Sequence, residues 1–387
     1  MARTQNKTAG PRITVRCPNP RCRTEYHVPA AAAGRRARCA ACGTKTMIPR
    51  IVAAPANGRA RATGPEIRIG SIGRGHAGKT ALFQVMSEGL VGEALPSGLH
   101  LDAADPRDVA RMIRETEATH RLLRKSGLPP TLEASSARYG LFEGDKRRAV
   151  CRMQEVVGQV LTHTLSDSEP QLQAKYTEYL KSLLASDVLW VVVPCPPADP
   201  GPRDQRRYAA DLRLTGAYLR EALRLRPADR RAAVALVLTK TDALFDNPEE
   251  AREALTDDVL VRALAPLIRL VEKSDHVSDA AIFPVTAFGF GKAVLRDDGD
   301  GRHGAEHEDE AFDDEPIWLL REGEQPDPYN LDALFLWSVL HGLLNLADAN
   351  PRAKPKLDLL CRKLRDDLEA EDPWLVPVKG GVVMATE

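Results

Sequence analysis

Aromatic residues and long apolar runs are both scarce in this 387-residue sequence, in which Phe, Trp and Tyr together make up 5%. Apolar stretches such as residues 188–193 are far too short to span a bilayer, and no apolar segment of the secretion-signal type follows the charged N-terminus. We therefore expect a cytoplasmic protein without a membrane span. The hydrophobic fraction of 43% is still enough to fill a sizeable core.

Net charge is also lacking, because 54 Lys and Arg residues balance 54 Asp and Glu residues. The two signs are nevertheless unevenly distributed. Residues 1–65 hold thirteen Lys or Arg residues against one acid, Glu25, whereas residues 297–315 hold ten acids against Arg302 alone. The first segment could steer an acidic partner, and the second is expected to be a solvated acidic loop.

Cysteines are few outside one basic stretch near the N-terminus. Cys17, Cys22, Cys39 and Cys42 lie close together, and the other three of the seven are isolated. In a reducing compartment this clustering favours metal over disulfides, and four thiolates close a tetrahedral Zn²⁺ site. Such a site is structural, since no coordination position stays open. His27 is interpreted as a strand residue between the two cysteine pairs.

The cysteine pairs resemble the short zinc ribbons of the kind C-P-x-x-C…C-x-x-C-G found at bacterial protein N-termini. The region has several arginines but one aromatic residue, Tyr26, that could stack on a base. We therefore favour a protein partner over nucleic acid. The zinc ribbon is assigned to residues 13–49, and residues 50–65, rich in Ala, Gly, Pro and Arg, are predicted to be a flexible linker.

From residue 66 to 387 the pattern predicts one α/β domain. Short apolar runs alternate with helical patterns, which favours a mainly parallel sheet with helices on both faces. Turn residues between the second and third runs predict an antiparallel edge hairpin. A helical insertion is expected near residues 105–126, and closing helices at 331–346 and 356–371. The expected strands are residues 67–72, 137–142, 149–153, 188–193, 232–238 and 281–285.

A phosphate-binding motif follows the first expected strand. Residues 73–80 read GRGHAGKT and fit G-x-x-x-x-G-K-[ST], the P-loop pattern, with a helix expected to follow. Backbone N–H groups of such a loop face phosphate oxygens, Lys79 reaches the β- and γ-phosphates, and Thr80 ligates Mg²⁺. The remaining predicted phosphate-site residues are Gly73, Gly75, His76, Ala77, Gly78 and Ala81.

A second motif indicates which base is bound. Thr239, Lys240 and Asp242 fall in the sequence TKTD after a later strand, and this segment resembles the [NT]-K-x-D motif of TRAFAC-class P-loop GTPases, the group of Ras-like and translation-factor GTPases. The resemblance covers residues 67–346. It implies that Asp242 accepts hydrogen bonds from guanine N1 and N2. It also matches Thr286 and Ala287 to the [ST]-A element whose backbone contacts the guanine oxygen.

The switch elements of that class have weaker counterparts. Residues 155–159 read EVVGQ where the class has D-x-x-G, so Glu155 replaces the aspartate that holds Mg²⁺ through a water. Gly158 would sense the γ-phosphate, and Gln159 falls where Ras-like GTPases orient the attacking water. Thr131 resembles the switch I threonine on Mg²⁺ and the γ-phosphate, with Thr116 and Thr119 as rivals. The P-P-T segment at residues 129–131 and the closing helix around Trp337 resemble features of bacterial double-GTPase-like proteins.

These motifs predict a GTP-binding molecular switch with GTP/GDP, Mg²⁺ and Zn²⁺ as cofactors and an unknown protein effector. Hydrolysis is expected to be slow and partner-stimulated, with Lys79, Thr131 and Gln159 as catalytic residues. An alternative, favoured by Glu155 and the basic N-terminus, is a zinc-ribbon adaptor for protein or nucleic acid whose GTPase-like domain binds nucleotide without cycling. A third reading, an ATPase, requires the TKTD match to be accidental.

Overall fold

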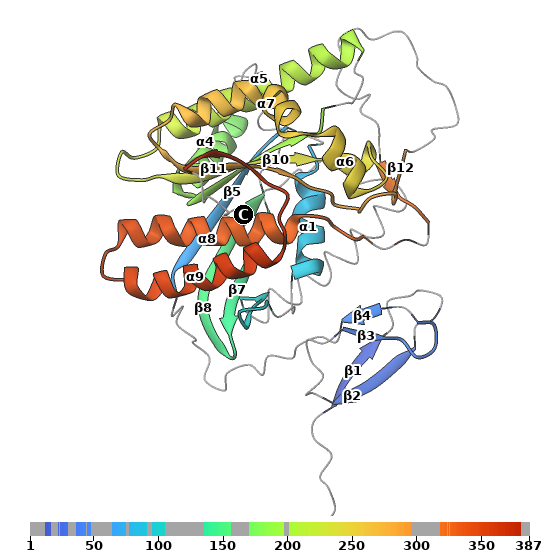
Figure 1. The fold of residues 1–387 in the computed structure, drawn as a ribbon. Helices are drawn as coiled ribbons and strands as arrows, with labels where there is room; N and C mark the ends of the chain where they lie inside the picture. Colours follow the sequence, from blue (N-terminus) through green and yellow to red (C-terminus); the bar gives the residue numbers. More distant parts are fainter. Residues whose placement is uncertain are drawn as a thin grey trace, which may run out of the picture.

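The computed structural model describes residues 12–16, 22, 24–29, 36–43, 45–47, 64–74, 77–90, 95–104, 135–155, 170–196, 201–295, 318–322, 324 and 326–380. A large mixed sheet forms the centre of the α/β domain (Figure 1). The strand order is β14-β11-β10-β9-β5-β8-β7-β6. Their bounds are β5 Glu66–Ile72, β6 Leu99–Ala103, β7 Ser135–Glu143, β8 Lys146–Glu155, β9 Val188–Pro194, β10 Ala232–Thr239, β11 Val277–Pro284 and β14 Val376–Lys379.

The five central strands β8, β5, β9, β10 and β11 are parallel to one another. Their carboxyl ends therefore meet at one edge of the sheet, which is where ligands bind in folds of this kind. The strands β6, β7 and β14 are antiparallel to their neighbours and extend the sheet on both sides. The result is a large, mostly parallel sheet, consistent with a P-loop NTPase fold.

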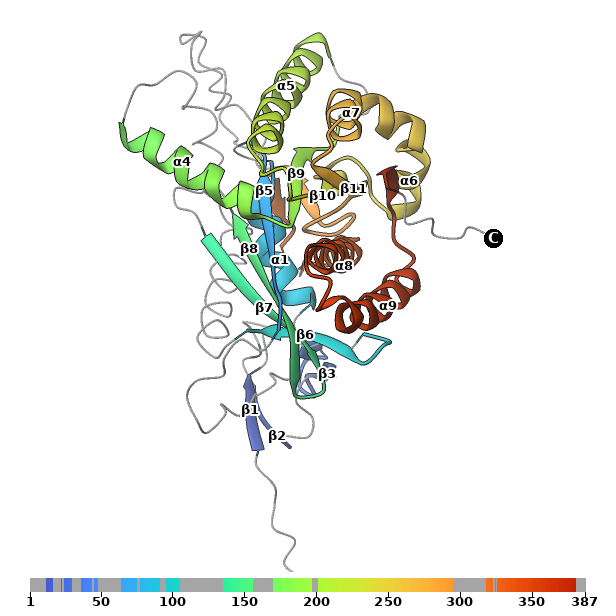
Figure 2. The same ribbon diagram turned by 90° about the vertical axis from the view of Figure 1, so that its left-hand side faces the viewer.

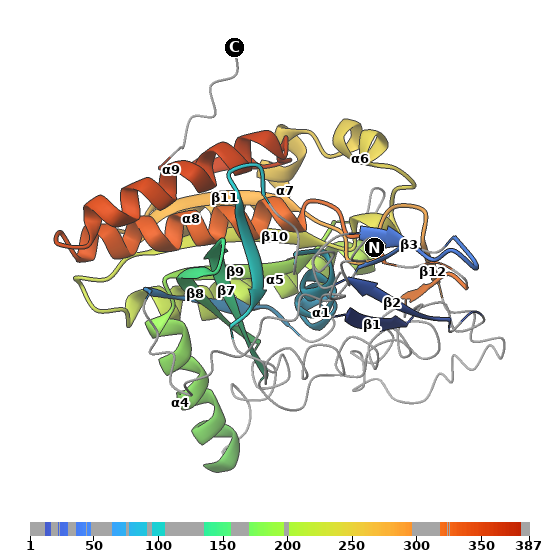
Figure 3. The same cartoon turned by 90° about the horizontal axis from the view of Figure 1, so that it is seen from below.

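Helices cover both faces of the sheet (Figure 2). One face carries α1 (Lys79–Leu90), α8 (Leu331–Ala349) and α9 (Lys354–Ala370), and the other carries α4 (Pro170–Ala185), α5 (Pro202–Arg224) and α7 (Asp257–Glu272). The short helix α6 (Pro248–Ala254) lies between β10 and α7 in the chain. The apolar helix α8 and the amphipathic helix α9 lie side by side (Figures 1 and 3).

The strand sequences explain why both faces are buried. Along β9, Trp190 and Val192 belong to the core under α8, whereas Leu189, Val191 and Val193 belong to the core on the opposite face. Successive side chains of a strand point to opposite faces, so a strand covered on both sides must be apolar throughout. Within its own core Trp190 donates its indole N–H to the Ser338 hydroxyl at 2.8 Å, which satisfies the buried donor.

All six strands expected from the sequence are present, and the expected hairpin is β7–β8 with Gly144 at φ 56° in its turn. Its predicted position at the edge of the sheet is wrong, because β6 pairs with the outer side of β7. The closing helices correspond to α8 and α9, which confirms both predictions. The edge strands β6 and β14 were not predicted, and β14 contains Pro377, a residue that argues against a strand. The predicted insertion at 105–126 and the acidic loop at 297–315 lie outside the described residues.

The described residues of the cysteine-containing segment form two antiparallel strand pairs. Strand β1 (Arg12–Arg16) pairs with β2 (Glu25–Pro29), and β3 (Arg36–Arg38) pairs with β4 (Lys45–Met47). A further two-stranded antiparallel sheet, β12 (Ala293–Leu295) with β13 (Trp318–Leu320), belongs to the α/β domain. Among the helices of the described residues, none combines the length and apolar character that crossing a membrane requires.

Candidate functional site

The predicted phosphate loop connects β5 to α1 at the carboxyl edge of the sheet. Gly73 follows β5 directly, and a Cβ at this position would lie 2.5 Å from the carbonyl oxygen of Val192, so only glycine fits. Gly78 has φ 83°, which glycine adopts without strain, and α1 begins at the next residue. Gly75 and His76 lie outside the described residues. The described glycines are thus required by the backbone path.

Lys79 is buried at the start of α1. Its Nζ lies 2.6 Å from the carbonyl oxygen of Gly73 and 2.5 Å from that of Arg74. An ammonium group taken out of water needs such acceptors, because burying an unpaired charge is costly. The side chain is therefore folded back over the loop, while Thr80 and Ala81 lie half-buried in the first turn of the helix. The N-terminus of α1, where backbone N–H groups point out of the helix, lies at the same place.

The TKTD segment lies directly against this loop. Thr239 is the last residue of β10, and its hydroxyl donates to the carbonyl oxygen of Ala77 at 2.7 Å. The Thr239 hydroxyl oxygen also lies 3.2 Å from the carbonyl oxygen of Val193. The Thr239 side chain is also what a Cβ on Gly78 would meet at 3.4 Å. Two motifs separated by 162 positions in the chain are thereby joined at the carboxyl ends of neighbouring strands.

Asp242 lies one turn beyond Thr239, in a short 3₁₀ segment from Thr241 to Ala243. Its Oδ2 accepts the backbone N–H of Phe288 at 3.0 Å. Burial raises the pKa of this carboxyl to about 6, although the hydrogen bond from Phe288 acts in the opposite direction. The preceding Lys240 adopts the left-handed conformation at φ 63°, which turns the chain between the two residues. Asp242 is therefore held against the loop that follows β11.

That loop begins with Thr286 and Ala287. Thr286 is fully buried and forms an isolated β-bridge with Tyr329, and its hydroxyl accepts the Tyr329 N–H at 3.1 Å. The hydroxyl of Thr241 donates to the Val285 carbonyl at 2.8 Å, which ties the ends of β10 and β11 together. The structure thus brings the three predicted segments, at 73–80, 239–242 and 286–287, to one edge of the sheet.

The switch residues are placed less completely. Glu155 is the last residue of β8, and the backbone of this strand pairs with β5 up to Gly70 and Gln154. The hydroxyl of Ser71 donates to the Gln154 carbonyl at 3.3 Å, so β8 ends beside the start of the phosphate loop. Thr131, Gly158 and Gln159 lie outside the described residues. Their predicted roles stay predictions.

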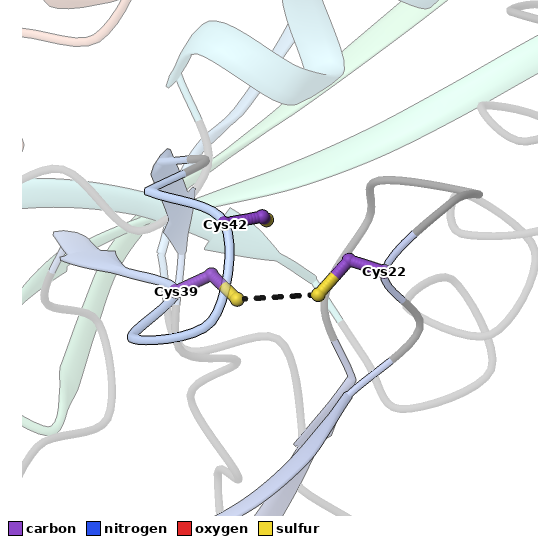
Figure 4. A group of neighbouring side chains, drawn as sticks. All are labelled: Cys22, Cys39 and Cys42. Atoms are coloured by element: carbon purple, nitrogen blue, oxygen red, sulfur yellow. Dashed lines mark hydrogen bonds between the residues drawn. The ribbon is translucent and has the colours of Figure 1, made fainter.

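Three of the four predicted zinc ligands converge (Figure 4). The sulfur atoms of Cys22, Cys39 and Cys42 all lie within 4.8 Å of one another, and those of Cys22 and Cys39 are 3.6 Å apart. Thiolates on one tetrahedral zinc, at Zn–S distances of about 2.3 Å, have sulfur–sulfur separations of about 3.8 Å. The described residues therefore fit a zinc site, with Cys17 outside the described part.

The Tyr26 hydroxyl lies 2.7 Å from the sulfur of Cys39 in the same cluster. This hydrogen bond is the main reason that the pKa of the Cys39 thiol is lowered to about 6. Metal binding requires the thiolate form of cysteine. The tyrosine that sequence reasoning weighed as a base-stacking residue is instead a hydrogen-bond partner of a predicted metal ligand.

Sequence reasoning missed two partners of the site. Asp211 on α5 binds the Arg74 guanidinium, and the Phe288 N–H binds Asp242. No sequence pattern marks either residue, because a helical aspartate and a loop amide become part of a site only through packing.

No protein-family model matches the sequence, and no curated protein matches it. Among solved structures, similar chains are a bacterial selenocysteine-specific elongation factor EF-Sec, at 15% identity and a TM-score of 0.29, and the translation elongation factor SelB from Methanococcus maripaludis in complex with the GTP analogue GppNHp, at 12% identity and a TM-score of 0.30. Each match covers 58% of this chain, but only 26% and 30% of those chains. A likeness this weak identifies no activity, so the function below rests on the residues of the site.

Proposed function

We propose that this chain is a GTP-binding molecular switch that hydrolyses GTP slowly with Mg²⁺, and whose turnover is raised by a partner. The observation that carries the proposal is the hydrogen bond from Thr239 to the carbonyl of Ala77. It attaches a guanine-type TKTD segment to a phosphate-type loop, so that one ligand can reach both. A nucleotide is the ligand class that combines a polyphosphate and a base at that spacing.

The phosphate half of the site is assigned to the loop and the first turn of α1. Lys79 would neutralise the β- and γ-phosphates, and backbone N–H groups from residues 77 to 81 would donate to phosphate oxygens. The fixed position of Lys79 on the carbonyls of Gly73 and Arg74 supports this role, since a preformed site loses less entropy on binding. Thr80 would ligate Mg²⁺, which when bound neutralises developing phosphate charge.

The base half is assigned to Asp242, Lys240 and the loop at Thr286 and Ala287. A carboxylate has acceptor capacity on both oxygens, so Asp242 can keep the Phe288 N–H and still accept from guanine N1 and N2. Adenine presents no such pair of donors on its edge. The aliphatic stem of Lys240 would cover the base, and the backbone at Thr286 and Ala287 would donate to the guanine oxygen.

We assign hydrolysis to the residues that resemble the switch elements of TRAFAC-class GTPases. Gln159 would orient the attacking water, Thr131 and Gly158 would respond to the γ-phosphate, and Glu155 would hold a Mg²⁺-bound water. Slow turnover is expected because Glu155 is one methylene longer than the family aspartate. It is also expected because Arg74, the one arginine in the sequence of the phosphate loop, has its guanidinium bound to Asp211 on α5 and so is not placed to stabilise the transition-state charge.

The N-terminal module is proposed to be a zinc ribbon that holds a structural Zn²⁺ through Cys17, Cys22, Cys39 and Cys42. A segment this small cannot bury enough apolar surface to fold alone, so the metal would stabilise it. We assign it the contact with the protein effector. If the α/β domain binds nucleotide without cycling, the chain is instead a zinc-ribbon adaptor, the reading that Glu155 favours.

The test is a competition experiment on the purified full-length protein. A fluorescent GTP analogue with Mg²⁺ is displaced by unlabelled GTP, GDP or ATP, and single-turnover hydrolysis of GTP is followed in parallel. We expect displacement by GTP and GDP but not by ATP, with slow cleavage. Absence of binding to every nucleotide would overturn the proposal, equal displacement by ATP would replace it with an ATPase, and binding without cleavage would favour the adaptor.

A further inference from the structure

An ion pair between Arg74 and Asp211 joins the phosphate loop to α5. Arg74, inside the loop, donates from Nη1 to the Oδ1 of Asp211, which lies on the inward face of α5. The two side chains retain 14% and 11% exposure, so the pair is largely removed from water. Loss of either partner from such a pair leaves an uncompensated buried charge. The contact therefore restrains the backbone of Arg74.

The backbone of Arg74 is where the restraint matters. Its carbonyl oxygen accepts from the ammonium of Lys79 at 2.5 Å and from the backbone N–H of Ala77 at 3.4 Å. The loop is rich in glycine, which holds its own conformation poorly because many backbone angles are open to it. Its far end is fixed at Ala77 by the hydroxyl of Thr239. Arg74 supplies the corresponding fixed point at the near end.

We infer that Arg74 and Asp211 are a positioning pair that holds the phosphate loop in its binding conformation, with the Arg74 carbonyl presented to Lys79. The inference rests on the proposed function, because it assigns the pair a role in binding the β-phosphate of a nucleotide. Neither residue needs to touch the ligand. The pair also connects α5 to the phosphate loop through a side-chain contact, in addition to α1, which continues directly from the loop.

A competing role for Arg74 is direct contact with the γ-phosphate. The structure favours positioning, because the guanidinium is turned to the carboxylate of α5. The two roles predict different results. A positioning pair acts on di- and triphosphates alike, and both of its members are needed equally. A direct contact makes Arg74 matter more for the triphosphate and leaves Asp211 less important.

The experiment compares the wild-type protein with R74A, D211A and the double variant. The dissociation constants of Mg²⁺-bound GTPγS and GDP are measured by calorimetry, and hydrogen exchange of residues 73–80 is measured without ligand. We expect each single variant to bind both nucleotides about tenfold more weakly, and the double variant to bind them no more weakly than either single variant. Hydrogen exchange of the loop should become faster in all three variants. R224A is the matched control, because Arg224 pairs with Glu221 on the same helix at an exposed position.

Unchanged affinities in R74A and D211A, with normal binding by the wild-type protein, would overturn the inference. A loss in R74A that is larger for GTPγS than for GDP and absent in D211A would also overturn it, in favour of direct contact. If D211A does not fold, the isosteric D211N is compared in the same way. Failure of the wild-type protein to bind either nucleotide would instead overturn the proposed function.

Discussion

The hydroxyl of Thr239 lies 2.7 Å from the carbonyl oxygen of Ala77, at the point where the ends of β10 and of the phosphate loop meet. The same hydroxyl lies 3.2 Å from the Val193 carbonyl on the strand between them. One side chain therefore connects three segments of the sheet edge. Thr239 is the last residue of a buried strand, and its hydroxyl lies within hydrogen-bond distance of buried carbonyl oxygens from two other segments.

The T239V variant tests this connection. Valine keeps the shape of threonine but removes the donor, so we expect the free energy of unfolding to fall by about 1–2 kcal/mol. Because Ala77 loses its fixed point, GTP and GDP should both bind more weakly. Urea unfolding and calorimetry measure the two effects. The control is T256V, since Thr256 is exposed and its side chain makes no helix-capping hydrogen bond. Equal behaviour of the two variants would contradict the assigned role of Thr239.

The D242N variant tests base recognition. Asparagine exchanges one carboxylate acceptor for an N–H donor, so guanine loses affinity and xanthine, which has an acceptor in place of the guanine amino group, gains it. We expect the affinity for GTP to fall by about tenfold to a hundredfold, the range for an unpaired buried hydrogen-bonding group. Competition between GTP and XTP against a fluorescent nucleotide gives the ratio. D246N, at an exposed position on the same loop, should leave the preference for GTP unchanged, and retention of guanine preference in D242N would refute the assignment.

The same residue predicts a pH dependence of stability. Burial raises the pKa of Asp242 from 3.8 to about 6, so the folded protein favours the protonated carboxyl. The stability that this proton contributes is present below pH 3.8 and is lost as the pH rises through 6. Between pH 4 and pH 7.5 the wild-type protein should therefore lose on the order of 2 kcal/mol of unfolding free energy relative to D242N. Urea denaturation of both proteins at the two pH values measures this difference. An equal change of unfolding free energy in the two proteins would contradict the prediction, since it would show that ionising Asp242 costs the folded state nothing.

The C39S variant tests the zinc site. Serine cannot replace a thiolate ligand of Zn²⁺ with similar affinity, and Cys39 is central to the cluster with Cys22 and Cys42. We expect the purified wild-type protein to contain bound zinc and the variant to lose it, as measured by elemental analysis. C361A serves as control, because Cys361 is buried on α9 in the α/β domain. Equal metal content in wild type and C39S would rule out Cys39 as a ligand.

The sequence was enough to locate the segments of the candidate site. Alternation of apolar runs predicted β5, β9, β10 and β11, because a strand buried on both faces has a short, continuous apolar signal that is local in the chain. Glycine spacing predicted the turn from β5 to α1 for the same reason. The chemistry assigned to Gln159 and Thr131 is likewise a sequence prediction, since both lie outside the described residues.

What the sequence by itself determined is the kind of residue at each strand end: a lysine after a glycine-rich turn, and a carboxylate after a buried strand. Only the tertiary structure decided that Thr239 meets Ala77, that Arg74 meets Asp211 and that Asp242 meets the Phe288 amide. These contacts join positions 162, 137 and 46 residues apart. The periodicity of a sequence encodes local conformation, whereas such distant partners are chosen by the order of strands in the sheet and by which helix packs beside each strand end.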